Sequence, residues 1–393
     1  MTLPNVMVAH VARAAPSIAL PLAGALLAAL LTFGGSLLVA HWCRRCGWVD
    51  RPEARRVHRH PVPRLGGIAI FAAFTAVALA LYRPRGAHET HVFIGLLLAS
   101  VLIVAVMAYD DVRGLPPWPR LGVQTLAAGL AIFPGAPGTL IEVIHNPLAA
   151  ANHGRIMLVG WLAVAFTWFW IVGMMNTINW MDGTDGLAGG VVAITATVMA
   201  VISWLLGQPG PALLCAVLAG ATLGFLPLNW HPARLFMGDS GAMFLGLALA
   251  VLANVGGAKL ATMLLLLGVP ILDTARVIAR RLRKGRSPLR SDRSHLHHRL
   301  LAGGFSQRQI AALFYGVTAA FGAITILAAY LPGRLGAWAR LAPLGGLALA
   351  GGTLAAILLV AVLRRRWLRL RHPEALPPSA SGSHYRLPAP SAR

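Results

Sequence analysis

Acidic residues are scarce in this chain: Asp and Glu together number 12 among 393 residues, against 34 Lys and Arg. Charged residues make up only 12% of the chain, whereas hydrophobic residues make up 57% and the mean hydropathy is +0.69. This composition excludes an ordinary soluble domain. The basic residues lie between long apolar runs and cover no polar face, which excludes nucleic acid as the expected partner and favours phospholipid headgroups and phosphate-bearing substrates.

Cysteine is also rare, because Cys43, Cys46 and Cys215 are the only three. They are too few for a disulfide framework, and the Cys43-x-x-Cys46 pair lacks the second pair that a zinc site would need. The first apolar run, roughly residues 17–40, is longer than a signal-peptide core and is followed by no small-residue cleavage pattern. We therefore predict a retained helix there.

A helix needs about 20 apolar residues to cross a bilayer, and the sequence predicts an all-α polytopic membrane protein with ten or eleven such helices. The predicted spans lie near 17–40, 65–82, 91–109, 120–134, 157–176, 187–206, 211–228, 240–256, 259–279, 309–330 and 342–363. Residues 135–156 predict a short hairpin on the membrane surface. The expected parts are an N-terminal segment (1–16), one membrane domain (17–363) and a basic tail (364–393) whose end, beyond Arg371, is expected to be disordered.

Basic residues also predict the orientation, because Lys and Arg are retained on the cytoplasmic side of the membrane. With the N-terminus outside, 26 basic residues fall in cytoplasmic segments and 7 on the opposite side. We expect a multi-pass protein of the bacterial inner membrane, with its N-terminus and the small hairpin periplasmic and its C-terminus cytoplasmic.

Acidic residues in a membrane protein often mark a functional site, because a charge at the centre of a membrane helix costs at least roughly 2.5 kcal/mol. Seven of the twelve fall on the predicted cytoplasmic side: Asp110, Asp111, Asp182, Asp185, Asp239, Asp273 and Asp292. The first two close the third predicted helix. Adjacent helical residues point about 100° apart, so one carboxylate is expected to face a cation or phosphate and the other a neighbouring helix or loop. A polar helix stop is the alternative.

A second group spans residues 176–187, where Asn176, Asn179, Asp182 and Asp185 recur every three residues. The glycines between them permit a loop that brings backbone close to a ligand. Oxygen ligands at this density suit Mg²⁺, with Mn²⁺ as a second choice, and a calcium loop would need a terminal Glu. A capped turn between two helices is the alternative.

The third group is Gly238-Asp239-Ser240-Gly241, at the start of the eighth predicted helix. Asp239 or Ser240 is able to act as an N-cap, which is the purely structural alternative. The positive end of this helix dipole is also expected to point at the same cytoplasmic ligands.

The fourth group is Asp292-Arg293-Ser-His295-Leu-His297-His298, which follows a run of arginines that topology and anionic lipid explain. A zinc site would need Cys or Glu in addition. Contact with the oxygens of a diphosphate is therefore the expected use of these imidazole and guanidinium groups. A fifth segment, residues 55–67, has a charge that topology explains, although His58 and Arg64 are also able to meet phosphate.

These motifs resemble, in order, those of the polyprenyl-phosphate N-acetylhexosamine-1-phosphate transferases, a family related to the phospho-N-acetylmuramoyl-pentapeptide transferases. The resemblance covers about residues 41–310. Its motifs are the Arg/His-Pro-x-x-Gly-Gly segment, the double Asp, Asn-x-x-Asn-x-x-Asp-Gly-x-Asp-Gly, Phe-Met-Gly-Asp-Ser-Gly and Asp-Arg-x-His-Leu-His-His. The last form is more similar to members that transfer N-acetylglucosamine 1-phosphate than to the peptidoglycan enzymes.

The resemblance implies a helical bundle with a cytoplasm-facing site for a UDP-N-acetylhexosamine and undecaprenyl phosphate. It implies Mg²⁺ held by Asn179 and Asp239, with Asp110 and Asp111 facing the phosphates or the metal. It also implies that Asp182 and Asp185 contact the nucleoside and that Asn176 binds substrate. Four further residues are implied to lie near the sugar or the diphosphate: Arg293, His295, His297 and His298.

The expected reaction is one in-line displacement in which the lipid phosphate attacks the β-phosphorus of the UDP-sugar and UMP leaves. It would start the assembly of a surface glycan such as an O-antigen or cell-wall polysaccharide. A two-step route through an aspartyl-linked phosphosugar, transfer of phospho-N-acetylmuramoyl-pentapeptide and ion-coupled transport are the alternatives. The sequence leaves open which N-acetylhexosamine is used and whether the protein is a homodimer.

Overall fold

The computed structural model describes residues 17–50, 61–132, 139–145, 155–255, 259–285, 287, 294–330 and 336–371. The first helices are α2 (Ala19–Cys46), α3 (Gly66–Leu81), α4 (Ala87–Arg113), α5 (Pro117–Ile132), α6 (Trp161–Met181) and α7 (Leu187–Leu205). They are followed by α8 (Pro209–Asn229), α9 (Gly238–Asn254), α10 (Lys259–Leu266), α11 (Gly268–Arg283), α12 (Leu296–Ala302), α13 (Gln307–Tyr330) and α14 (Gly336–Arg371).

The prediction of an all-α polytopic membrane protein is confirmed. Each predicted span contains a helix, and six described helices are long and apolar enough to cross a membrane. The ninth predicted span is divided into α10 and α11, which separate at Leu267, just before Pro270. The last helix, α14, continues to Arg371, past residue 363 where the membrane domain is predicted to end.

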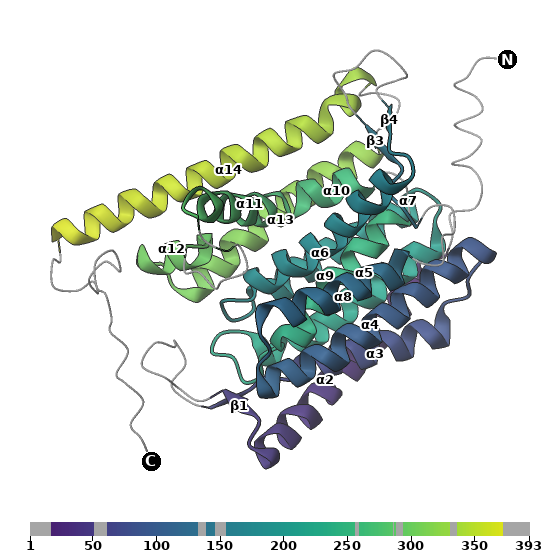
Figure 1. Cartoon of the computed structure of the whole chain (residues 1–393), viewed down its shortest axis with the longest axis horizontal. Helices are drawn as coiled ribbons and strands as arrows, with labels where there is room; N and C mark the ends of the chain where they lie inside the picture. Colours follow the sequence, from purple (N-terminus) through teal and green to yellow (C-terminus); the bar gives the residue numbers. More distant parts are fainter. Residues whose placement is uncertain are drawn as a thin grey trace.

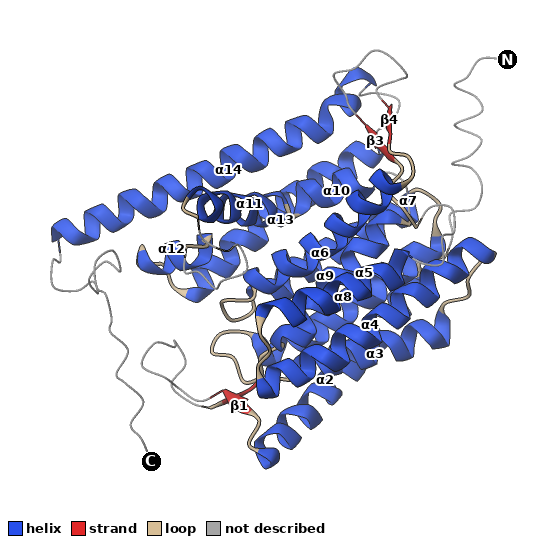
Figure 2. Ribbon diagram, in the orientation of Figure 1, coloured by secondary structure: helices blue, strands red, loops and turns tan. Residues whose placement is uncertain are grey.

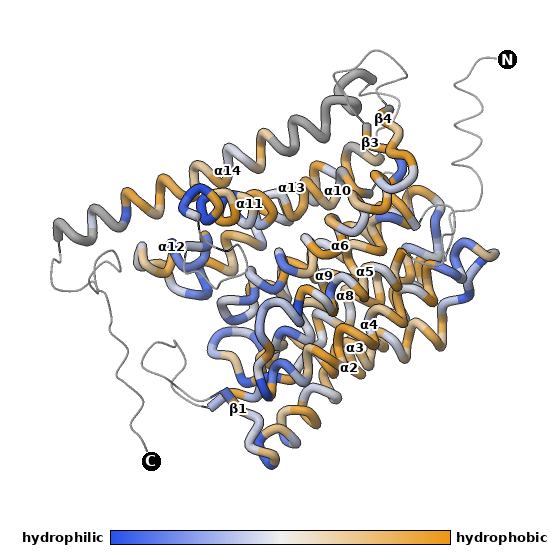
Figure 3. The backbone as a smooth tube through the Cα atoms, in the orientation of Figure 1, coloured by the Kyte–Doolittle hydropathy of each residue, from blue (hydrophilic) through white to orange (hydrophobic). Residues whose placement is uncertain are grey.

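Strands form only two small antiparallel pairs in the described residues (Figure 2). β1 (Val49–Asp50) pairs with β2 (Val62–Pro63), and β3 (Val143–His145) pairs with β4 (Arg155–Met157), which is the predicted surface hairpin. β1 and α12 lie at one end of the bundle and β3 and β4 at the other (Figure 1). Hydrophilic residues gather at the loops and helix ends, while the middles of the helices are hydrophobic (Figure 3).

Helix α9 is the centre of the bundle, and it packs against α3, α4, α6, α7, α8 and α10. Nearly all of its residues are buried, including the large side chain of Phe244, which meets Phe71 and Phe74 edge-on. A helix that is apolar on every side is stable only when neighbours surround it. Because α9 begins at Gly238, the core of the protein fixes the position of the Asp239 motif.

The start of α3 is bound directly to the start of α9. The amide groups of Gly66 and Gly67 donate to the carbonyl oxygens of Phe236 and Met237, at 2.9 and 2.8 Å, which satisfies donors that a helix N-terminus leaves unpaired. A Cβ on Gly67 would overlap the backbone of Gly241. The two glycines of this segment therefore allow two helix ends to approach at backbone distance.

Helices α2 and α8 also pack through small residues. A Cβ on Gly220 would overlap the carbonyl of Ala25, and one on Gly224 would overlap that of Ala29. Small residues four apart allow two membrane helices to approach closely, where packing and weak polar contacts hold them together.

We expect Gly220→Ala to lower the melting temperature of the detergent-purified protein, because the added methyl group overlaps the backbone of α2 and overpacking costs about 1–3 kcal/mol. Gly129→Ala, on α5, is the matched control, since a Cβ there meets open space. It should leave the melting temperature unchanged or raise it slightly. Equal melting temperatures for the two variants would contradict the packing described for α2 and α8.

Candidate functional site

Four chain segments meet at the end of the bundle that carries β1 and α12. They are the last turn of α4, the end of α6 with the loop that follows it, the first turn of α9, and α12 (Figure 1). Each contributes one of the polar motifs that the sequence contains. The structure therefore brings together side chains that are more than a hundred residues apart.

Asp111, at the end of α4, holds the first turn of α9. Its Oδ1 accepts the amide of Asp239 at 2.8 Å, and its Oδ2 accepts the amide and the hydroxyl of Ser240 at 3.1 and 2.8 Å. A carboxylate is favoured at a helix N-terminus, where free amides and the positive dipole end lie. Gly238 has a φ of +73°, and a Cβ there would overlap this carboxylate. The alternative that Asp239 or Ser240 caps the helix is wrong, because the cap comes from another helix.

Arg120, on α5, joins two of the other acids. Its Nη1 lies 2.7 Å from Oδ2 of Asp239, and its Nε lies 2.9 Å from Oδ2 of Asp110. Asp110 is buried, and its Oδ1 also accepts the amide of Leu115. Arg120 is not among the site residues predicted from the sequence, although a lone charge at the start of an apolar helix is the signal by which it could have been found.

The amide side chains of α6 complete this contact. Asn179 donates from Nδ2 to Oδ1 of Asp239 at 2.9 Å, so the two predicted metal ligands lie side by side. Asn176 lies one turn deeper, and its Nδ2 donates to Gln124 at 2.7 Å and to the carbonyl of Val172 at 2.8 Å. Gln124, one turn after Arg120 on α5, is a further polar group of the site that was not predicted from the sequence.

Asp182 ends α6 and has an unfavourable electrostatic environment. Burial raises its pKa well above the usual range, and the nearby carboxylates of Asp239, Asp111 and Asp185 raise it further, while Arg64 acts in the opposite direction. No hydrogen bond to its carboxylate occurs among the described residues. The site thus holds an excess of negative charge, which a cationic group would relieve. Arg64 belongs to the segment of residues 55–67, whose charge the membrane topology explains and for which phosphate contact is the other predicted use.

Asp185 points to the far side of the same loop. Its Oδ2 lies 2.7 Å from Nδ1 of His231 and accepts the amide of Ala233 at 3.1 Å, and its own amide donates to Gln307 at 2.9 Å. These contacts fasten the α6–α7 loop to the α8–α9 loop and to the start of α13. The predicted nucleoside contact of Asp185 stays a prediction.

The histidines lie on and just before α12. The rings of His295 and His297 are stacked with centroids 6.0 Å apart, and His298 lies 4.2 Å from His297. His295 also meets the indole of Trp180, at the end of α6, at 5.6 Å. Asp292 and Arg293, like His58, lie outside the described residues, so their predicted roles stay predictions.

His297 packs directly against the acid-rich loop. It is 4% exposed, and a Cβ on Gly183 would overlap its Nε2, an atom without a hydrogen-bond partner in the described part of the chain. Burial lowers the pKa of His297 to about 3, and the neighbouring His298 and His295 rings act in the same direction. A neutral His297 therefore joins α12 to the Asp182–Asp185 loop, and a glycine at position 183 leaves it room.

The residues present fit a magnesium ion. Mg²⁺ is commonly held by one or two carboxylates and completes its shell with water and substrate phosphates. The hydrogen bond from Nδ2 of Asn179 to Oδ1 of Asp239 brings an amide side chain and a carboxylate together, and both side chains carry oxygen atoms. They lie beside Asp182, whose pKa is raised by burial and by the neighbouring acids. Within the described ranges no three His, Cys, Asp or Glu residues are arranged to hold a metal ion by themselves.

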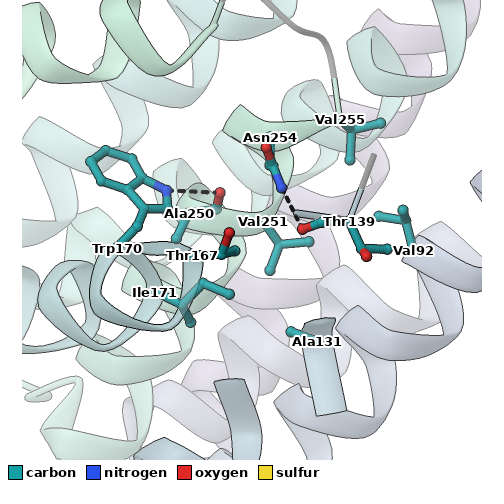
Figure 4. A pocket seen from close by; sticks show the side chains of 10 residues that line it. All are labelled: Val92, Ala131, Thr139, Thr167, Trp170, Ile171, Ala250, Val251, Asn254 and Val255. Atoms are coloured by element: carbon teal, nitrogen blue, oxygen red, sulfur yellow. Dashed lines mark hydrogen bonds between the residues drawn. The ribbon is translucent and has the colours of Figure 1, made fainter. Parts of the chain in front are cut away.

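A separate cavity lies at the opposite end of α9, near β3. Its polar contacts are internal: Trp170 donates to the carbonyl of Ala250 at 3.2 Å, and Asn254 donates to that of Thr139 (Figure 4). Its remaining lining side chains are mostly apolar, and none of them is charged. It therefore offers no group suited to phosphate chemistry.

Fold and site together define a multi-pass membrane protein that gathers carboxylates, amides, an arginine and imidazoles at one end of its bundle. Residues 93–257 match the model of glycosyl transferase family 4.

Curated relatives agree with this match. The chain is 37% identical to the decaprenyl-phosphate N-acetylglucosaminephosphotransferase of Mycolicibacterium smegmatis, over 74% of this chain and 77% of that protein. It is 34% identical to the probable undecaprenyl-phosphate N-acetylglucosaminyl 1-phosphate transferase of Bacillus subtilis, over 69% and 74%. It is 29% identical to the undecaprenyl-phosphate alpha-N-acetylglucosaminyl 1-phosphate transferase of Escherichia coli, over 73% and 78%. The chain belongs to glycosyl transferase family 4.

Asp182→Asn should raise the melting temperature of the purified protein in EDTA at about pH 8, by roughly 2 °C or more. The raised pKa means that folding disfavours the ionised carboxyl, so an uncharged amide is tolerated better. The difference should shrink as the pH falls below this raised pKa. It should vanish toward about pH 4, the ordinary carboxyl range, where the side chain is protonated in the folded protein and begins to be protonated in the unfolded chain. Glu142→Gln, an exposed acid beside β3, is the control. A lower melting temperature for Asp182→Asn at the higher pH would contradict this electrostatic reading.

Proposed function

We propose that the protein transfers N-acetylglucosamine 1-phosphate from its UDP-sugar to a polyprenyl phosphate such as undecaprenyl phosphate, and that UMP is released. The observation that carries the proposal is the contact of Asn179, Asp239 and Arg120 at the first turn of the most buried helix. A carboxylate, an amide side chain and a guanidinium brought together in this way suit a metal-bound diphosphate.

In this proposal Mg²⁺ is held by Asp239 and Asn179, and when bound it would neutralise charge on the diphosphate. Arg120 neutralises Asp110 and Asp239 in the structure, and its guanidinium is partly exposed. When substrate binds, the guanidinium of Arg120 is therefore able to release a carboxylate and to bind a phosphate oxygen in its place. Asp111 fixes the first turn of α9, so that Asp239 keeps its place during the reaction.

The engagement of the double Asp supports a single in-line displacement. Both oxygens of Asp111 accept hydrogen bonds, and Asp110 is buried in an ion pair, so neither is presented as a nucleophile. The lipid phosphate is mostly ionised near neutral pH and needs little help from a base. Alignment of the two substrates and neutralisation of charge then account for the catalysis. The two-step route through an aspartyl-linked phosphosugar is the alternative.

The site is proposed to face the cytoplasm from a bacterial inner membrane, with the N-terminus on the outer side. The excess of basic residues on that face, 26 against 7, supports this orientation. The names of the relatives support N-acetylglucosamine as the sugar and a polyprenyl phosphate as the acceptor. The product would then begin the lipid-linked assembly of a surface glycan.

We expect purified protein supplied with UDP-N-acetylglucosamine, undecaprenyl phosphate and Mg²⁺ to release UMP, and Asp239→Asn to reduce the rate by roughly 100-fold. The amide keeps the shape of the carboxylate but removes the charge that the metal and Arg120 require. Glu142→Gln, at the opposite end of the bundle, should release UMP at the parent rate. Equal release by Asp239→Asn and the parent protein would count against the site, and no release by the parent would count against the reaction.

A further inference from the structure

Asp273, in α11, is a buried carboxylate with every oxygen in use. It is 5% exposed. Its Oδ1 accepts Nη2 of Arg276 at 2.6 Å, and its Oδ2 lies 3.1 Å from Nδ1 of His295 and 2.9 Å from the amide of Leu296. A charge at such depth is costly unless it is paired and fully hydrogen-bonded, and here it is both.

The same carboxylate ties α11 to the segment that carries the histidines. Arg276 donates from Nη2 to the carbonyl of Ser294 at 2.8 Å, in addition to its bond to Asp273. Asp273 binds the next two residues, His295 through the ring and Leu296 through the backbone. The entry of the chain into α12 is therefore held from one side by a single ion pair.

His295 is fixed on its other sides by rings. Trp180 lies 5.6 Å from its centroid, and His297 is stacked on it with an interplanar angle of 6°. A carboxylate can only accept, so the hydrogen shared with Asp273 belongs to Nδ1 of His295. Arg276 already balances the charge of Asp273, so the carboxylate acts on the ring chiefly through hydrogen-bond geometry. Among the described residues Nε2 of His295 has no hydrogen-bond partner.

We propose that Asp273 is a positioning residue: it holds His295 with the proton on Nδ1, so that Nε2 is presented to the donor sugar as a hydrogen-bond acceptor. Such an acceptor suits a hydroxyl or an amide N–H of an N-acetylhexosamine, because the diphosphate carries no proton to give near neutral pH. This inference rests on the proposed function. It gives Asp273 a role in the reaction through His295, without direct contact between Asp273 and the substrate.

A double-mutant cycle tests whether Asp273 acts through His295. Asp273→Asn should lower kcat for UMP release by roughly 10–100-fold, the usual cost of losing the partner that orients a functional histidine. In the His295→Gln background the same change should cost less than about 3-fold, since the group it orients is gone. Losses that multiply in the double variant would show that Asp273 is merely structural and would overturn the proposal.

Asp273→Glu is the conservative variant, because it keeps an acceptor and a charge on a longer arm. It should retain more activity than Asp273→Asn, and it supplies the cycle if the asparagine variant aggregates during purification. Asp273→Glu could instead lose as much activity as His295→Gln while its melting temperature stays unchanged. That result would also contradict positioning by hydrogen bonding.

Nitrogen-15 NMR of histidine-labelled protein gives a readout that does not depend on turnover. The His295 signal, assigned by its absence in His295→Gln, should show a protonated Nδ1 and an unprotonated Nε2 in the parent protein. Asp273→Asn should shift this tautomer balance, as an amide can donate where the carboxylate could only accept. An unchanged His295 signal overturns the proposal. If the parent released no UMP, the proposed function would fail while this spectrum still tested the positioning of His295.

Discussion

The structure depends on a cluster of carboxylates held close together at a helix end where water is limited. Asp110, Asp111 and Asp239 come from two helices that are distant in sequence, and Asp182 stands near them with a raised pKa. Like charges at such spacing repel strongly unless cationic groups or hydrogen-bond donors separate them. Arg120 and the first amides of α9 do this in the structure. These contacts join the end of α4, the start of α5 and the start of α9 at one place.

The surrounding helices support this cluster because they pack around the central helix α9 on every side. Helix α9 is buried on all sides, and glycines at Gly67 and Gly238 let α3 and Asp111 reach its first turn at backbone distance. The histidines are held differently. They lie on or next to the short helix α12, which contacts α11 through Asp273 and the Asp182–Asp185 loop through His297. The divided helix α10–α11 thus brings a polar face of α11, with Asp273, against the site.

Much of this arrangement could be predicted from the sequence. Long apolar runs predict the helices, and acids retained beside them predict the site, because both patterns reflect the cost of charge in a membrane. The partners of those acids could not be predicted: Arg120 and Gln124 come from another helix, and the cap of α9 comes from Asp111. The break at Leu267 was also missed, since a continuous apolar run does not reveal where two helices part. Such contacts depend on tertiary packing, which one sequence does not display.

In the proposed reaction, Asp239 and Asn179 hold a metal ion against the diphosphate of the donor. Mn²⁺ in place of Mg²⁺ allows this to be measured by pulsed electron paramagnetic resonance on purified protein with UDP-N-acetylglucosamine. We expect phosphorus-31 couplings to the bound ion in the parent protein and their loss in an Asn179→Ala, Asp239→Asn double variant. Couplings of equal strength in both proteins, or Mn²⁺ bound with no phosphorus nearby, would contradict it.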